Sequence, residues 1–140
     1  MKDNINIVIK GFRLNSWIEN VVSQIEKNQK IGENEWSIVI TNDKEIRRLN
    51  KKYRKKDKTT DVLSFAECDI NPKFVLEKKY LGEVIINYEQ AKRQAKDLKK
   101  EILYLLIHGY LHLKSYTHDN DKDEMVMNKE ADKIIQKIKL

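Results

Sequence analysis

The segment KKEILYLLIHGYLHL, residues 99–113, is apolar on almost every side when it is wound as a helix. A helix with this pattern is buried on most sides rather than laid on a surface with one face in water. The segments around it must then supply the layers that cover it. Two of the three histidines of the chain also lie in this segment, so the predicted core helix carries candidate functional residues.

The flanking segments alternate between strand and helix patterns. β-Branched or alternating apolar runs predict strands at residues 5–10, 35–41, 61–67 and 81–87. Apolar residues spaced three and four apart predict helices at 15–29, 42–54, 88–98 and 121–138. With residues 99–113 this gives about five helices, and the interleaving predicts an α/β (α+β) layer structure. Some strands are joined by short connections, which favours a mixed sheet over a purely parallel one.

Length and composition limit the class of protein. A chain of 140 residues, 40% hydrophobic and 36% charged, is long enough for a single domain, residues 1–140, with its own core. The formal net charge of +6 favours an acidic partner, nucleic acid first, with solubility alone as the alternative. Cys68 has no second cysteine to pair with, and no signal peptide or run of roughly 20 apolar residues is present. We therefore expect a cytoplasmic protein with no membrane partner.

All three histidines lie in HGYLHLKSYTH, residues 108–118. On a helix His108 and His112 lie one turn apart on one face, as two metal ligands require. His118 joins them only if the chain turns back soon after Leu113. Three imidazoles with an open fourth position form a catalytic zinc site, whereas structural sites are usually closed by four ligands and rich in cysteine. The alternative is that each histidine is hydrogen-bonded in or near the core.

The histidine spacing also matches the metzincin pattern H-E-x-x-H-x-x-G-x-x-H. Gly109 stands where that pattern has the glutamate that acts as general base, so peptide hydrolysis by that route lacks its proton acceptor. A glycine inside a helix costs about 1 kcal/mol relative to alanine. Gly109 therefore indicates a close approach at this point, either of packed backbone or of a substrate.

A second candidate segment is LNKKYRKKDKTTDVLSF, residues 49–65. It carries five positive charges between Lys51 and Lys56, with Tyr53 among them. Arginine grips a phosphate through two parallel hydrogen bonds and keeps its charge at every relevant pH. The segment runs directly into a buried-looking strand, which brings its charges to a sheet end, where sites in α/β proteins tend to lie. The alternative is a solvated basic turn.

These segments resemble the YbeY endoribonucleases, which are bacterial ribosomal-RNA maturation factors. Residues 108–118 resemble the signature H-G-x-L-H-L-x-G-Y-D-H, and residues 49–65 resemble L-N-x-x-Y-R-x-K-D-x-P-T-D-V-L-S-F. LGEVIIN, residues 81–87, resembles the L-G-D-I-x-I segment of the family. The resemblance implies a four-stranded mixed sheet flanked by helices, with a metal site at the end of the buried central helix.

The resemblance also implies site residues. It places one zinc-like ion on His108, His112 and His118, and it maps a functional arginine onto Arg54. Thr59, Glu83, Ser115 and Thr117 replace the Pro, Asp, Gly and Asp of the family motifs, and Ala66 replaces a frequent Pro. None of these changes removes a ligand, but the changes at 115 and 117 alter the turn and remove a carboxylate beside the ion.

The hypothesis from sequence is a metal-dependent endoribonuclease specific for single strands. It would process the 3′ end of small-subunit ribosomal RNA and act in ribosome quality control, with ribosomal RNA and the small subunit as partners. The predicted catalytic residues are Arg54, His108, His112 and His118, and the predicted cofactor is one Zn²⁺ per chain, with nickel or another divalent ion as an alternative. Two alternatives are a non-catalytic ribosome assembly factor with a structural metal and a metallohydrolase of another substrate class. The sequence defines neither the general acid nor the oligomeric state.

Overall fold

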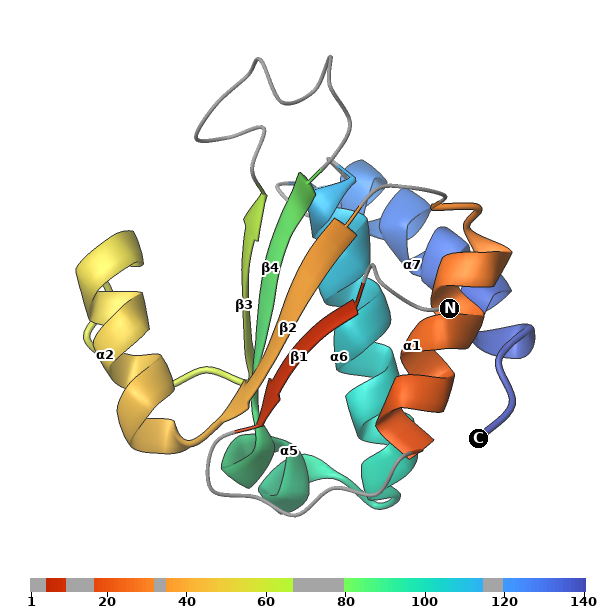
Figure 1. Ribbon diagram of the computed structural model, residues 1–140. Coiled ribbons are helices and arrows are strands. Elements are labelled where there is room, and N and C mark those ends of the chain that lie inside the picture. The colour runs from red at the N-terminus through yellow and green to blue at the C-terminus, as the bar shows by residue number, and fades with distance from the viewer. Residues whose placement is uncertain (1–4, 10–16, 32–34, 67–79, 115–119) are drawn as a thin grey trace.

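The computed structural model describes residues 5–9, 17–31, 35–66, 80–114 and 120–140 (Figure 1). Its strands are β1 Ile5–Ile9, β2 Glu35–Thr41, β3 Val62–Ala66 and β4 Tyr80–Asn87. Its helices are α1 Trp17–Asn28, α2 Asp43–Arg54, α5 Tyr88–Gln94, α6 Leu98–Leu113 and α7 Asp121–Gln136. Five helices thus lie within these ranges, and the predicted α/β architecture is confirmed.

The strands form one sheet in the order β1-β2-β4-β3. β1, β2 and β4 are parallel, whereas β3 runs antiparallel to β4, with Val62 opposite Ile86 and Ala66 opposite Gly82. The sheet is therefore mixed, as the short connections predicted. Among the described strands, β3 lies at one edge.

Helices cover both faces of the sheet (Figure 1). α1 and α6 lie on one face with α7 beside them, and α2 lies on the opposite face. The larger core includes Trp36, Ile38, Ile40, Val84 and Ile86 from β2 and β4. A smaller cluster on the α2 side consists of Ile46, Leu63 and Ile85. Alternate residues of β4 thus enter both clusters, which explains why that strand is nearly continuous in apolar residues.

α6 is the central buried element, as predicted. Nine of its 16 residues are buried, and they face the sheet, α1 and α7. The ring of Tyr110 packs edge-on against Trp36, with centroids 5.4 Å apart, and the indole Nε1 of Trp36 donates to Glu26 Oε2 at 3.0 Å. No helix in the described ranges has both the length and the apolarity needed to cross a membrane.

Gly109 allows α6 to lie directly against the sheet. A Cβ at this position would lie 2.5 Å from Val84 Cγ1 and 3.3 Å from Ser64 Oγ. The close approach indicated by the sequence is therefore explained by packing against side chains of β4 and β3.

One predicted helix is wrong in extent. The helix predicted over residues 88–98 ends at Gln94, because Ala95 adopts an extended conformation with φ −91° and ψ 139°. Asp97 then caps α6 by accepting a hydrogen bond from the Lys100 backbone N–H at 3.3 Å. An aspartate that caps a following helix competes with continuation of the preceding one. At this break the chain changes direction between α5 and α6, and α6 then packs against one face of the sheet (Figure 1).

Gly82 generates the first prediction. Its φ is +136°, and a Cβ there would lie 2.2 Å from the backbone oxygen of Phe65. Backbone strain and overpacking each cost about 1–3 kcal/mol, so Gly82→Ala is expected to lower the free energy of unfolding by about 2–4 kcal/mol. Urea denaturation followed by circular dichroism measures this change.

Gly109→Ala is the comparison for that experiment. Its clash with Val84 is offset in part by about 1 kcal/mol of helix propensity, so its loss should be smaller. A Gly82→Ala protein that unfolds at the parent urea concentration would contradict the argument.

Candidate active site

A cavity of about 500 Å³ lies along β3, between the C-terminal end of α2 and the last turn of α6. Its lining residues are Asn50, Arg54, Lys56, Lys58, Thr60, Asp61, Val62, Leu63, Ser64, Ala66 and His112. Two of the predicted catalytic residues, Arg54 and His112, therefore share one cavity although 57 residues separate them in the sequence.

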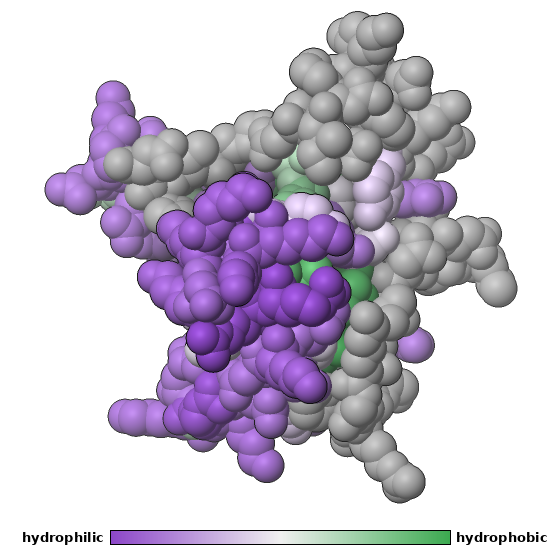
Figure 2. All heavy atoms as spheres, turned by 90° about the vertical axis from the view of Figure 1, so that its left-hand side faces the viewer, coloured by the Kyte–Doolittle hydropathy of each residue, from purple (hydrophilic) through white to green (hydrophobic). Residues whose placement is uncertain are grey.

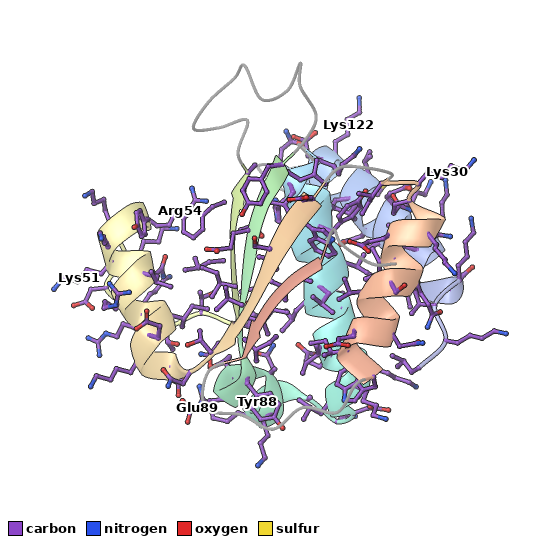
Figure 3. The ribbon with its side chains drawn as sticks, in the orientation of Figure 1. Lys30, Lys51, Arg54, Tyr88, Glu89 and Lys122 are labelled. Atoms are coloured by element: carbon purple, nitrogen blue, oxygen red, sulfur yellow. The ribbon has the colours of Figure 1, made fainter. Side chains whose placement is uncertain are left out.

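The guanidinium group of Arg54 contacts two residues of β3. Its guanidinium Nη2 donates to the backbone oxygen of Ser64 at 2.5 Å, and its Cζ lies 4.7 Å from the centroid of the Phe65 ring. Tyr53 packs edge-on against the same ring at 5.5 Å. Figure 3 shows Arg54 at the sheet side of α2, whereas Lys51 points outward. No carboxylate in the described ranges pairs with Arg54, so its other N–H groups are available to an anion.

The basic loop after α2 has a defined structure. Lys55 ends the helix in a left-handed conformation, with φ 61° and ψ 28°. The buried Asn50 then fixes both ends of the turn: its backbone oxygen accepts from Lys56 N at 3.2 Å, and its Nδ2 donates to Lys58 O at 3.0 Å. Because of this anchoring, Lys56 and Lys58 lie on the cavity wall, and the segment is more than a solvated turn.

The cations that line the cavity are not neutralised by ion pairs within the described residues. Figure 2 looks onto the side that carries α2, where hydrophilic residues form a continuous surface. On this helix Arg47 pairs with Asp57 at 2.9 Å and Arg48 pairs with Glu45 at 2.6 Å. The three cations of the cavity lining have no such carboxylate partner among the described residues. The cavity is therefore suited to an anion.

His108 lies one turn before His112 on α6, as predicted. Its Nδ1 is 2.9 Å from the backbone oxygen of Tyr104, and its ring lies 3.9 Å from the Tyr104 ring, measured between centroids. A carbonyl oxygen only accepts, so Nδ1 carries the proton and Nε2 carries the free lone pair. Nε2 lies 3.3 Å from Asn128 Oδ1 of α7, and rotating that amide by half a turn presents its NH₂ group instead. An imidazole oriented in this way by backbone is typical of a metal ligand.

The third predicted ligand, His118, lies outside the described residues, as do Ser115 and Thr117. Among the residues that the structure describes, no three His, Cys, Asp or Glu side chains are arranged to hold a metal ion. The two described histidines fit the predicted ligand set in spacing and in the orientation of His108. The three-histidine site itself stays a prediction.

Asp61 is a cavity residue that sequence reasoning did not single out. Its Oδ2 accepts from Gln94 Nε2 at 3.0 Å, and the same amide donates to Glu101 Oε2 of α6 at 2.6 Å. Burial raises the pKa of the Tyr104 hydroxyl, and the negative charges of Glu101 and Asp61 raise it further. Two signals were available in the sequence: Asp61 lies between the basic loop and a predicted strand, and it matches the Asp of the T-D-V-L-S-F motif.

The C-terminal end of the basic loop, at Thr60, is fixed by hydrogen bonds around Asp43 at the start of α2. We call Asp43, Asn87 and Arg93 the Asp43 clamp. Its two carboxylate oxygens accept from Arg93 Nη1 and Nη2 at 2.7 and 2.8 Å. Asn87 Nδ2 donates to Asp43 Oδ1 at 2.7 Å and also to the cavity residue Thr60, through its backbone oxygen, at 3.1 Å. The hydrogen bonds from Arg93, and next those from Asn87, hold the pKa of Asp43 well below its usual range.

Together these features define a class: an α/β protein with an anion-binding cavity at the edge of a mixed sheet, beside histidines on its core helix. The sequence profile of one family, described as "Endoribonuclease YbeY", matches residues 2–139 of the chain. The chain belongs to the YbeY family.

Individual relatives agree with this assignment. "Endoribonuclease YbeY" of Persephonella marina is 38% identical over 128 residues, which cover 88% of this chain and 82% of that protein. "Endoribonuclease YbeY" of Phytoplasma australiense is 38% identical over 138 residues, covering 93% and 91% of the two chains. The solution structure of TM1509 from Thermotoga maritima is 27% identical and superposes with a TM-score of 0.64, covering 95% of this chain and 87% of that one.

The Asp43 clamp generates a prediction for pH dependence. A carboxyl group whose pKa is lower in the folded than in the unfolded chain stabilises the fold above the unfolded value of about 3.9, and this contribution is lost as the pH falls. Asp43→Asn should therefore cost about 1–2 kcal/mol at pH 7, a modest loss because the ion pair is partly exposed, and progressively less as the pH falls below about 4 toward the lowered pKa of the folded state. Urea denaturation of both proteins between pH 2 and 7 measures the difference.

Asp57→Asn is the matched control for this prediction. Its hydrogen bond and ion pair with Arg47 are exposed, so its effect at pH 7 should be close to zero. A difference between the parent and Asp43→Asn that stays constant from pH 7 to pH 2 would show that the clamp does not act through the charge of Asp43.

Proposed function

We propose that this chain is a metal-dependent endoribonuclease that cleaves single-stranded RNA. The observation that carries the proposal is the cavity that Arg54, two further cations and His112 line together. A polyanion cleaved at a phosphodiester needs cations to bind it and a catalytic centre next to the bound phosphate. The printed names of the relatives, which match most of the chain, support the same activity.

Arg54 is the proposed phosphate ligand. One of its N–H groups is engaged by the Ser64 carbonyl, and stacking over Phe65 restricts the plane of the guanidinium. The remaining donors form a fixed fork that fits two oxygens of a phosphate. As negative charge builds on those oxygens in the transition state, a guanidinium that is already in place stabilises it without reorganisation.

His108, His112 and His118 are proposed to hold one Zn²⁺, with nickel or another divalent ion as the alternative. When bound, such an ion supplies Lewis acidity to a phosphoryl oxygen or a water molecule. The chain prepares this site in two ways. The Tyr104 carbonyl fixes the proton of His108 on Nδ1, and His112 lies in the last turn of α6, where the negative end of the helix dipole favours a cation.

The preference for single strands is proposed to rest on Tyr53. Its side chain is 55% exposed, packs edge-on against Phe65, and lies under Lys52 Nζ, which is 5.1 Å from the ring centroid. Exposed aromatic rings among cations bind single strands because every unpaired base offers a face for stacking. A duplex keeps its bases stacked on one another and offers no such face.

The biological substrate is proposed to be ribosomal RNA at the 3′ end of the small-subunit species, in the cytoplasm, with a further role in ribosome quality control. This part of the proposal is supported by the resemblance to the family and by the net charge of +6. In the ribosome-assembly alternative the same cavity binds RNA and does not cut it.

Arg54→Lys tests the proposed phosphate ligand. Lysine keeps the charge but loses the fork, so kcat/KM for a labelled single-stranded ribosomal-RNA fragment should fall by roughly 10²–10³. The measurement uses zinc-loaded parent and variant purified in the same way, because contaminating ribonucleases would hide the effect. Arg47→Lys is the control, since Arg47 lies on the same helix but pairs with Asp57 outside the cavity lining. A variant with the parent rate would exclude Arg54 from the reaction.

His118→Ala tests the metal site. The parent should bind one zinc per chain. Losing a residue that only hydrogen-bonds to a metal ligand costs roughly 10–100-fold in affinity, so losing the ligand itself should weaken zinc binding by more than that. Equilibrium dialysis with metal analysis measures the binding, and RNA cleavage is measured on the same samples. Cleavage by the parent and none by the folded variant is the expected result. Equal cleavage by both would contradict the nuclease proposal, and RNA binding without cleavage by either would favour the assembly factor.

A further inference from the structure

The cavity that is suited to an anion contains a carboxylate in its own wall. Asp61 is partly buried and is the acidic member of a lining that includes Arg54, Lys56 and Lys58. Within the described residues its side chain forms no ion pair and accepts a hydrogen bond from the neutral amide of Gln94. A negative charge there opposes phosphate binding, so neither charge pairing nor the phosphate explains it.

Asp61 and Arg54 lie at different ends of the cavity. Arg54 bonds to the carbonyl of Ser64, and Asp61 precedes Ser64 by three residues, which corresponds to about 10 Å along an extended strand. The cavity therefore has a cationic end near His112 and an acceptor end at Asp61. One nucleotide spans such an interval when its phosphate lies at the first end and the far edge of its base at the second.

The carboxylate at the acceptor end is oriented by its neighbours. Gln94 donates through one amide group to both Asp61 Oδ2 and Glu101 Oε2. Because Glu101 belongs to the buried helix α6, Gln94 connects Asp61 to the core helix of the fold. A hydrogen-bonding group fixed in this way can discriminate between ligands, since it does not turn to suit each one.

We propose that Asp61 reads the base of the nucleotide whose phosphate is bound by Arg54, and that it selects guanine. This inference rests on the proposed ribonuclease function. A carboxylate only accepts hydrogen bonds, and guanine offers two adjacent donors, N1–H and the N2 amino group, which match its two oxygens. Adenine and cytosine offer one amino group beside an acceptor nitrogen. Uracil offers one N–H between two carbonyl oxygens, which the carboxylate repels.

Binding of short RNA tests the inference separately from cleavage. The probes are fluorescent oligouridines that contain one guanosine or one inosine, whose base lacks the N2 amino group. Fluorescence anisotropy in the presence of EDTA keeps the RNA intact. The parent should bind the guanosine probe roughly tenfold more tightly than the inosine probe, because one charge-assisted hydrogen bond is lost. Asp61→Asn should bind the two probes equally.

Asp57→Asn is the matched control, because it removes the same charge from an exposed carboxylate outside the cavity lining. It should keep the discrimination between guanosine and inosine. Equal binding of both probes by the unaltered parent overturns the inference whether or not any variant folds, and so does discrimination that persists in Asp61→Asn. In either case cleavage of the ribosomal-RNA fragment by the parent leaves the proposed function standing. Failure of the parent to bind or cleave any RNA removes both proposals.

Discussion

The contact between Gly109 of α6 and Val84 of β4 sets the distance between the core helix and the sheet. A side chain at 109 would push the helix away, because a Cβ there has only 2.5 Å to the nearest methyl group of Val84. One turn further on, Leu113 packs over Gly82 of β4, where a Cβ would lie 2.9 Å from its Cδ2. His112 lies between these two contacts. Its place in the cavity wall, which Arg54 also lines, follows from two glycines that keep the last turn of α6 against the sheet.

The sequence predicted the elements whose signal is local and continuous. α6 was identified because its apolar residues leave almost no polar face, and β4 because its residues are apolar enough for a central strand. The end of α5 was missed, since the helical spacing continues past Gln94 and only the cap at Asp97 breaks it. The Asp43 clamp was also missed, because it joins residues 44 and 50 positions apart. No local pattern marks such a contact.

For the site, the sequence identified the residue types with distinctive chemistry and the resemblance identified Arg54. The structure showed which other residues line the cavity with them. Asp61 matches the Asp of the quoted T-D-V-L-S-F motif, but its place before a strand is one where an aspartate is ordinarily read as a turn residue. Its meaning depends on the cations that line the same cavity, and these come from a helix end and a loop. The described residues place two histidines, while the third lies beyond them.

The distribution of charge is governed by pairing as much as by number. Exposed pairs such as Arg47 with Asp57 contribute little to stability, because water and salt screen them. They do, however, neutralise cations away from the cavity and leave those in its lining uncompensated. The uncompensated cations of the lining thus attract a polyanion to the cavity along β3.

The hydrogen bond from Arg54 to the Ser64 carbonyl has a consequence for the solution behaviour of the protein. β3 lies at the edge of the described sheet, and an edge strand offers its outward-facing backbone groups to any other strand that approaches. Arg54 occupies one of these groups and holds a charged side chain across the edge, where it hinders pairing with a second copy of the chain. The residue proposed to bind the substrate thus also hinders strand-to-strand aggregation at β3. Loss of this arginine would leave the backbone of the edge strand more accessible to a second chain.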